Sequence, residues 1–183
     1  MRIGSGEMRG RRLHAPRGER TRPTSGRLKK SLFDVLAGRL PGARVLDLYA
    51  GSGSLAFEAL SRGAAHAVVV ERNRKACESI RRNAFELRLS DRVEILSMEV
   101  SSGLSKLRHR GDRFHVIFAD PPYRTSDSED LLVNLGEDPL LAEGGVLVLE
   151  HHHKRELRDR YGSLVRVRVL KAGESILTLF GPE

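Results

Sequence analysis

Hydrophobic residues follow two patterns along the chain: short runs rich in apolar residues, and longer stretches with an apolar residue every three or four positions. The runs predict buried strands, and the helical spacing predicts helices. The expected strands are at 44–49, 67–71, 93–96, 114–119, 145–150, 164–170 and 175–180. The expected helices are at 28–40, 55–62, 74–89, 103–108, 131–141 and 154–161, and Thr24-Ser25 offers an N-cap for the first of them.

The order of these elements predicts the class of fold. Strands that alternate with helices form parallel βαβ units, so we expect a doubly wound α/β sheet. The last two strands have no helix between them and pair antiparallel, so one strand is expected to run against the others. Ligands of such sheets bind at the carboxyl ends of the strands. The loops of interest therefore follow Leu48, Val70, Leu96 and Ala119.

Positive charge is concentrated at the N-terminus. The 183 residues have the length of one domain and a net charge of +8, and residues 1–30, with ten basic and two acidic residues, hold all of this excess. Such a cluster favours a polyanionic partner, since phosphate contacts release counterions; a solvated basic tail is the alternative. Residues 1–5 and 8–13 are expected to form a hairpin across Gly6. We therefore divide the chain into a basic hairpin extension and loop, 1–24, and a main domain, 25–183.

Other features exclude several classes of protein. No apolar run approaches the roughly 18–20 residues that span a bilayer, and residues 1–12 lack the apolar core of a secretory signal. A single cysteine, Cys77, rules out an internal disulfide and a cysteine-based metal cluster and is typical of a small packed residue. Adjacent side chains in His151-His152-His153 point to opposite faces, so we expect a solvated strand end and no metal site. These features indicate a cytoplasmic protein.

The loop after the first strand has a glycine pattern typical of nucleotide binding. It reads Asp47-Leu48-Tyr49-Ala50-Gly51-Ser52-Gly53-Ser54-Leu55-Ala56, which contains G-x-G-x-x-A between a strand and a helix. Glycines there let the backbone turn sharply and approach a ligand. Glu71 ends the second strand, 20 residues after Gly51, where an acid can accept hydrogen bonds from ribose hydroxyls. A dinucleotide and a nucleoside both fit this arrangement.

Asp47 favours one of these two cofactors. A carboxylate four residues before Gly51 would repel a pyrophosphate, whose site is electropositive. The same carboxylate suits a ligand with a cationic amino group. We therefore expect S-adenosylmethionine (SAM) in place of NAD.

The loop after the fourth strand reads Asp120-Pro121-Pro122-Tyr123. Two prolines end a central strand and make a stiff turn, which holds an acid and an aromatic at the expected ligand edge. The exocyclic amine of a nucleic-acid base is a poor nucleophile because its lone pair is conjugated with the ring. A carboxylate and a backbone carbonyl that accept its N–H bonds orient the lone pair toward a sulfonium methyl. Tyr123 can stack on the flat base.

The chain resembles the bacterial 16S rRNA guanine-N2 methyltransferases of the RsmD type. The resemblance covers nearly the whole chain. It rests on Met1-Arg2-Ile3 with Gly10-Arg11, Thr21-Arg22-Pro23-Thr24-Ser25, Leu32-Phe33, Leu46 to Gly53, Glu58 to Ala64, Glu71, Asn83 and Asp120 to Tyr123. It implies a Rossmann-like class I SAM-dependent methyltransferase sheet, mostly parallel with one antiparallel strand, and a small N-terminal hairpin. The implied partner is 16S rRNA or the assembling 30S subunit, without a metal or a membrane.

The resemblance also implies roles for individual residues. The catalytic residues are Asp120, Pro121, Pro122 and Tyr123. The cofactor-binding residues are Asp47, Tyr49, Gly51, Gly53, Glu71, Arg72, Glu99 and Thr24. The RNA-binding residues are Arg2, Arg9, Arg11, Arg12 and Arg22.

The sequence departs from the family pattern at two places and leaves one close alternative. The usual Asp after the third strand is replaced by Ser97-Met98-Glu99, and the usual Tyr-Gly near the C-terminus by Ala172-Gly173. An Asp-Pro-Pro-Tyr loop also serves adenine-N6 DNA methyltransferases, or another amino-methyltransferase of nucleic acid. However, the chain has no insertion that would read the major groove, and a basic hairpin suits RNA phosphates. A binding module without catalysis is a further alternative, which the intact Asp120 and glycines disfavour.

Overall fold

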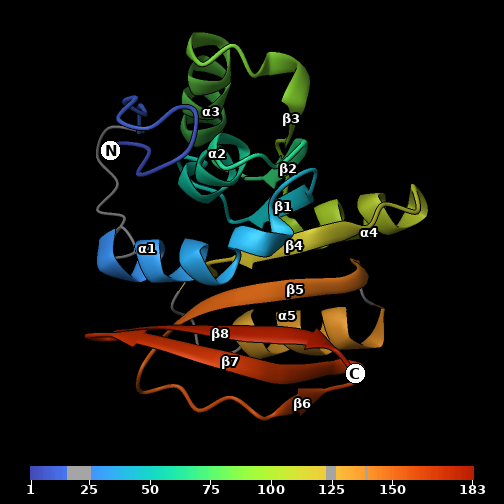
Figure 1. Cartoon of the computed structure of the whole chain (residues 1–183). Helices are drawn as coiled ribbons and strands as arrows, with labels where there is room; N and C mark the ends of the chain where they lie inside the picture. The colour runs from blue at the N-terminus through green and yellow to red at the C-terminus, as the bar shows by residue number, and fades with distance from the viewer. Residues whose placement is uncertain (16–25, 123–126, 139) are drawn as a thin grey trace.

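A mixed eight-stranded sheet, in the order β3-β2-β1-β4-β5-β8-β7-β6, forms the centre of the protein (Figure 1). The computed structural model describes residues 1–15, 26–122, 127–138 and 140–183. The strands are β1 (Arg44–Leu48), β2 (His66–Val70), β3 (Val93–Leu96), β4 (Phe114–Ala119), β5 (Leu141–His152), β6 (Arg160–Tyr161), β7 (Leu164–Ala172) and β8 (Ser175–Pro182).

Strand direction confirms the sequence-based expectation. The strands β1 to β5 run parallel, and β8 lies between β5 and β7 and is antiparallel to both. The two-residue β6 pairs antiparallel with β7 and so adds a second reversed segment at the sheet edge. The carboxyl ends of β1, β2 and β4 therefore lie at one edge of the sheet, because these strands are neighbours in register.

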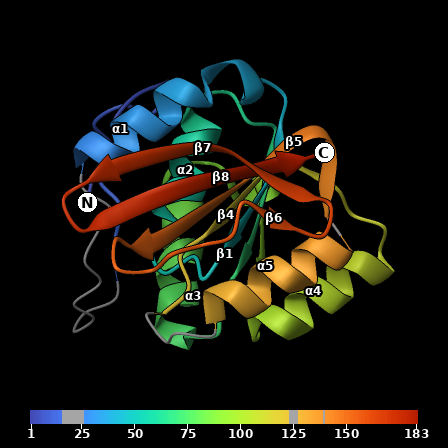
Figure 2. The same ribbon diagram turned by 90° about the horizontal axis from the view of Figure 1, so that it is seen from below.

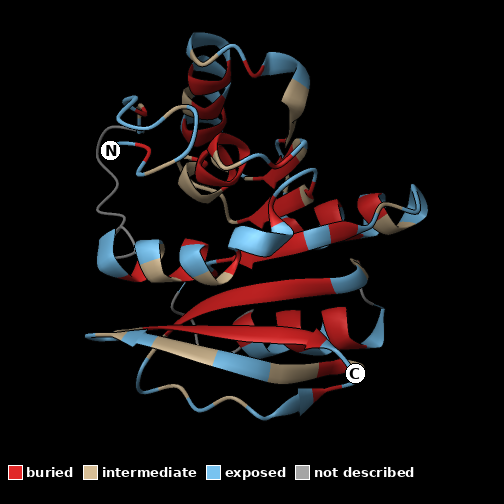
Figure 3. Cartoon of the chain, in the orientation of Figure 1, coloured by how far each residue is buried: buried red, intermediate tan, exposed pale blue. Residues whose placement is uncertain are grey.

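Helices cover both faces of the sheet (Figure 2). They are α1 (Gly26–Val35), α2 (Ser54–Ser61), α3 (Arg74–Glu86), α4 (Val100–His109) and α5 (Asp127–Glu137), with short 3-10 turns η1 (Ala37–Arg39) and η2 (Ser90–Arg92). Apolar residues of α1, α2 and α3 form one core with one face of the sheet, and those of α4 and α5 form a second core with the other face. Figure 3 shows the buried residues gathered in the strands and the inner sides of the helices.

One expected helix is wrong. We expected a helix at 154–161, but this segment is a turn and an irregular stretch that ends in β6. Leu157 and Tyr161 are its only apolar residues, which is too few for a buried helical stripe. Pairing of Tyr161 with Leu164 in β7 decides the local structure. The helix expected at 131–141 also begins earlier and ends earlier, as α5.

The N-terminal residues are packed on the domain. Backbone hydrogen bonds join Ile3 N–H to Arg11 (3.0 Å) and Leu13 N–H to Met1 (2.9 Å), and Arg2 and Arg12 form an isolated β-bridge. The expected hairpin pairing is therefore present as a single bridge, without regular strands. Ile3 and Leu13 are only 1% and 2% exposed and join the core of α1, α2 and α3. No helix in the described ranges is both long and apolar enough to cross a membrane.

Candidate active site

The glycine turn after β1 takes a conformation that ordinary side chains rarely adopt. Gly51 and Gly53 have φ values of 54° and 73°, and Tyr49 is a non-glycine residue with φ 59°. A Cβ at Gly53 would come within 3.0 Å of the Phe57 ring and 3.3 Å of Ile80, so this position also needs glycine for space. A Cβ at Gly51 would meet no atom within 4 Å, so the backbone there faces open space.

Glu71 closes the turn from the neighbouring strand. One of its carboxylate oxygens accepts a hydrogen bond from Gly51 N–H (2.8 Å), and the other accepts one from Asn73 N–H (2.8 Å). The acid at the end of β2 is thus held at the glycine turn, as the spacing predicted. A carboxylate oxygen has two lone pairs, so each oxygen keeps capacity for a ligand hydroxyl.

Asp47 is a buried acid beneath the same turn. Its side chain is 3% exposed and accepts a hydrogen bond from Ala56 N–H in the first turn of α2 (3.1 Å). Burial raises the pKa of Asp47 to about 8. That value already includes the nearby charges of Asp120 and Glu71, which also raise the pKa, and the Ala56 N–H and the Lys29 ammonium, which lower it. A buried carboxyl whose pKa lies near neutral pH is suited to a cationic ligand, because the positive charge of the ligand would stabilise the ionised form of the carboxyl.

The loop after β4 brings Asp120 to the same edge. Solvent still reaches this side chain, but protein atoms surround most of it. The resulting loss of water raises the pKa of Asp120 to about 7, and the nearby Glu150 acts in the same direction. Pro121 is buried and Pro122 is exposed, and Tyr123 lies outside the described residues. Asp47, Gly51, Gly53, Glu71 and Asp120 therefore all meet at one edge of the sheet.

The structure also brings together Arg72 and Glu99. Their side chains form an ion pair of 3.2 Å and are 69% and 61% exposed. Arg72 follows β2 and Glu99 precedes α4, so the pair spans the edge beside Tyr49. Thr24, also expected to bind the cofactor, lies outside the described residues.

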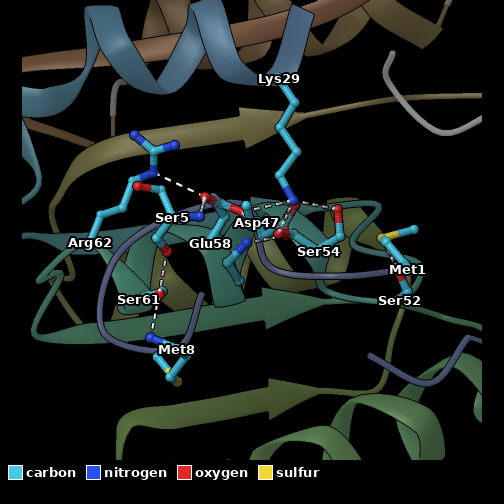
Figure 4. Close-up of polar contacts among 12 residues, drawn as sticks. Met1, Ser5, Met8, Lys29, Asp47, Ser52, Ser54, Glu58, Ser61 and Arg62 are labelled. Carbon is cyan, nitrogen blue, oxygen red and sulfur yellow. Dashed lines mark hydrogen bonds and ion pairs between the residues drawn. The ribbon is translucent and has the colours of Figure 1, made fainter. Parts of the chain in front are cut away.

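Lys29 is a site residue that our sequence analysis missed. Its ammonium donates to the Ser54 carbonyl oxygen (3.0 Å) and the Ser54 hydroxyl (3.4 Å), and pairs with Glu58 at 3.3 Å. Figure 4 shows its side chain extending from α1 to Ser54, Glu58 and Asp47. Burial lowers the pKa of Lys29, while the charges of Glu58 and Asp47 act against that change. The sequence signal was its position four residues before Phe33, on the apolar side of α1.

Glu58 anchors the basic N-terminal segment, residues 1–15. This carboxylate is 1% exposed, accepts hydrogen bonds from the Gly4 and Ser5 N–H groups (2.8 and 3.0 Å) and pairs with Arg62 at 3.0 Å (Figure 4). Burial opposes its ionisation, but the Gly4 N–H, Lys29 and Arg62 outweigh burial and lower the pKa of Glu58. A loose tail would not make these contacts, so the described part of this segment is folded on α2.

Four of the expected RNA-binding residues lie on this segment and are exposed: Arg2, Arg9, Arg11 and Arg12. Arg2 and Arg11 are oriented by hydrogen bonds to the Gly10 and Glu86 carbonyl oxygens (2.8 and 3.0 Å). Arg22 lies outside the described residues. The segment thus presents guanidinium groups from a fixed backbone.

The histidine run and the cysteine have structural roles. His151 is 7% exposed and its Nε2 lies 2.8 Å from the Thr178 hydroxyl, so the expected solvated strand end is wrong at this residue. The antiparallel partner β8 buries it, and β8 was not assigned as its neighbour from the sequence. No cluster of potential metal ligands occurs among the residues the structure describes. Cys77 is fully buried in α3, as expected.

Comparison with known proteins identifies the family. The model of the family "Conserved hypothetical protein 95" matches residues 1–181. "Putative rRNA methyltransferase YlbH" of Bacillus subtilis is 38% identical over 168 residues, which cover 92% of this chain and 91% of that protein. "Ribosomal RNA small subunit methyltransferase D" of Escherichia coli is 33% identical over 150 residues, which cover 82% of this chain and 74% of that protein.

A solved structure agrees with these relatives. "Putative methyltransferase yhhF from Escherichia coli" superposes with a TM-score of 0.86 at 31% identity and covers 100% of this chain and 98% of its own. The fold of a class I methyltransferase is therefore confirmed, as is the resemblance drawn from the motifs. The chain belongs to the Conserved hypothetical protein 95 family, the family of the RsmD-type methyltransferases.

Proposed function

We propose that this protein methylates 16S rRNA, transferring the methyl group of SAM to the exocyclic N2 amine of a guanine during assembly of the small ribosomal subunit in the cytoplasm. The observation that carries the proposal is the meeting of Asp47, Glu71 and Asp120 around the glycine turn. Asp47 suits the methionine end of SAM and Glu71 its adenosine end, and Asp120 lies where a target amine would approach. The relatives named above are rRNA methyltransferases by name.

The residues of the turn fit SAM. The open space at Gly51 allows the backbone to approach an adenosine, and Glu71 has lone pairs for its ribose hydroxyls. The Asp47 carboxylate, once ionised, holds the ammonium of the methionine end. Tyr49, Gly53, Arg72, Glu99 and Thr24 complete the proposed set of cofactor contacts. When bound, this cofactor supplies an electrophilic methyl group on a sulfonium.

Asp120 acts on the amine. Its carboxylate and a carbonyl of the stiff Pro121-Pro122 turn accept the two N–H bonds, which directs the nitrogen lone pair toward the methyl group. The nitrogen would gain a bond to the methyl carbon as the bond between that carbon and the sulfonium sulfur breaks, which would leave a neutral thioether, and the nitrogen would release one proton. A carboxyl with a pKa of about 7 is matched to accept that proton near neutral pH. Tyr123 stacks on the base, which must first leave its own stack.

Positive charge supplies the affinity for RNA. Arg2, Arg9, Arg11, Arg12 and Arg22 bind phosphates, and the fixed backbone of the N-terminal segment reduces the ordering cost of that contact. The substrate is naked 16S rRNA or the assembling 30S particle.

Methyl transfer from labelled SAM tests the proposal. The purified protein is incubated with a 16S rRNA transcript, with 30S subunits from cells that lack the gene, and with duplex DNA. We expect N2-methylguanosine by mass spectrometry of the digested rRNA. Labelling of adenine N6, or of DNA alone, would overturn the guanine assignment in favour of the adenine alternative.

A further inference from the structure

Phe85 is an exposed aromatic residue at the end of α3. At 77% it is the most exposed large apolar side chain in the described part of the chain, ahead of Val167 at 61%. Burying such a ring would stabilise the fold, and here the ring faces solvent. Isolated exposed apolar residues are common on proteins, so the surroundings of the ring decide whether it has a role.

Three arginines lie within four residues of Phe85. Arg81 and Arg82 precede Phe85 by four and three residues, which places them beside it on the helix surface, and Arg88 follows it by three. All three are exposed (Figure 3 shows the outer side of α3). Arg82 pairs with Glu86 at 2.8 Å, and Glu78 lies two turns away, about 10 Å along the axis. The ring therefore lies in a surface dominated by guanidinium groups.

Arg88, just after α3, has a left-handed backbone conformation that is unfavourable for a residue other than glycine. Arg88 has φ 59°, and the Leu89 N–H bonds back to the Ala84 carbonyl (2.8 Å), which closes the helix at a left-handed residue. Glycine is the usual residue at such a helix end, because it adopts positive φ without strain. An arginine at this position has an energetic cost, and it places one more exposed guanidinium at the end of α3.

The N-terminal segment adjoins this surface directly. The Arg11 guanidinium donates to the Glu86 carbonyl oxygen (3.0 Å), His14 Nε2 lies 2.9 Å from the Glu86 carboxylate, and Asn83 hydrogen-bonds with the backbone of His14. Figure 1 shows the segment against α2 and α3. The exposed arginines of residues 1–15 and those at the end of α3 thus lie on adjoining surfaces, which Glu86 joins.

We propose that Phe85, with Arg81, Arg82 and Arg88, is a second RNA-binding surface on which an unpaired base of the substrate stacks while its flanking phosphates contact the arginines. Charge complementarity favours RNA as the occupant, because closely spaced cations repel one another unless a polyanion lies over them. An exposed ring between cations suits a splayed base, the form in which proteins read single-stranded RNA. The inference rests on the proposed RNA substrate and extends its footprint beyond the N-terminal segment.

Binding of a 12-nucleotide single-stranded RNA with one 2-aminopurine, and of a 16S rRNA transcript, tests this surface. Phe85→Ala is expected to weaken binding roughly 5- to 150-fold, the range for loss of one stacked base. Its log-log salt slope should equal that of the wild type, because no charge is lost. Arg81→Ala and Arg88→Ala should each lower that slope by about 0.7. The 2-aminopurine fluorescence should be quenched by the wild type and by Phe85→Trp.

Control variants separate base stacking from a purely apolar contact. Phe85→Leu keeps apolar bulk without a π face and should bind as weakly as Phe85→Ala. Val167→Ala removes a similarly exposed apolar side chain on β7 and should bind like the wild type. Wild-type affinity of Phe85→Ala or Phe85→Leu for RNA would overturn the proposal. If Phe85→Ala kept its RNA affinity but lost binding to the 30S particle, the occupant of this surface would be a protein. A wild type that methylates DNA and binds no RNA would overturn the proposed function as well.

Discussion

The Glu71 carboxylate accepts a hydrogen bond from the backbone N–H of Gly51 across the ends of two neighbouring strands, at 2.8 Å. The acid that we propose for the ribose therefore also holds the turn that we propose for the adenosine. Loss of this side chain would remove a ligand contact and loosen the turn together. Because the Glu71 carboxylate and the glycine turn are already oriented before the ligand binds, less conformational entropy is lost on binding.

Glu71→Ala is accordingly expected to weaken SAM binding tenfold or more, since a hydrogen bond with a charged partner contributes about 1.5–3 kcal/mol. Titration calorimetry measures this change. Glu71→Gln should bind SAM with intermediate affinity, because its one amide oxygen can still accept from Gly51 N–H but its NH2 then faces the Asn73 N–H donor. If Glu71→Ala binds SAM as tightly as the wild type, the adenosine lies elsewhere.

Asp120→Asn should leave SAM affinity nearly unchanged and lower methyl transfer on the order of 10²- to 10³-fold, because it removes a charge aimed at the reacting amine. Single-turnover rates with saturating SAM measure this effect. Near-normal turnover in the variant would show that another group orients the amine.

The pH profile of the wild type should report the same residue. The pKa of Asp120 is raised to about 7, so the carboxyl is protonated below that pH and ionised above it. Turnover should therefore rise with pH up to about 7 and then level off, with up to a tenfold change per unit on the acidic side. The turnover of Asp120→Asn should not show this rise with pH. A flat profile in the wild type would exclude Asp120 as the proton acceptor.

Lys29→Met should shift the pH dependence of SAM binding. Asp47 has a pKa of about 8 and must lose its proton to hold the ammonium, so affinity should increase as pH rises toward 8. The Lys29 ammonium lowers that pKa, so Lys29→Met should move the increase to higher pH and Lys29→Arg should restore it. SAM itself titrates identically with every variant, so a difference between the pH curves of SAM binding comes from the protein. Identical curves for Lys29→Met and wild type would refute the electrostatic role.

Replacing Arg2, Arg9, Arg11 and Arg12 with Gln should reduce the salt slope of RNA binding by roughly two to four and leave SAM binding intact. Deleting residues 1–15 is a poorer test, because it removes the buried Ile3 and Leu13 and leaves Glu58 without its backbone donors. Loss of one such apolar side chain costs about 2–5 kcal/mol of stability. An unaltered salt slope in the quadruple variant would refute the N-terminal segment as an RNA contact.

The sequence predicted the sheet and its ligand edge because those features follow from local pattern. Runs rich in apolar residues mark β1 and β4, and the glycines and prolines after them mark turns whatever the rest of the chain does. The burial of His151 against Thr178 depends on which strand lies next to β5, which no local pattern records. The helix expected at 154–161 is wrong because two apolar residues are too few for a buried helical face and the end of the segment pairs with β7.

Two further features required three-dimensional neighbours. Lys29 belongs to the site only because α1 packs across the first turn of α2, where the Ser54 carbonyl oxygen accepts from its ammonium. The sequence predicted a basic hairpin at the N-terminus but not where it packs: the Gly4 and Ser5 N–H groups bind a carboxylate more than fifty residues away. Hydrogen bonds of backbone groups to distant residues cannot be predicted from the pattern of side chains along the sequence.

The order of strands in the sheet has a consequence for the behaviour of the protein at high concentration. The two outermost strands are β3, with four residues, and β6, with two. An edge strand can pair with another chain in proportion to the length of unpaired backbone it offers, and charged side chains hinder such pairing. Glu94 lies on β3 and pairs with Arg110, and Arg160 lies on β6. The border at β3 is therefore a poor template for strand addition. At the other border β6 covers only the start of β7 (Leu164–Ala172), where the basic residues Arg166, Arg168 and Lys171 hinder such pairing.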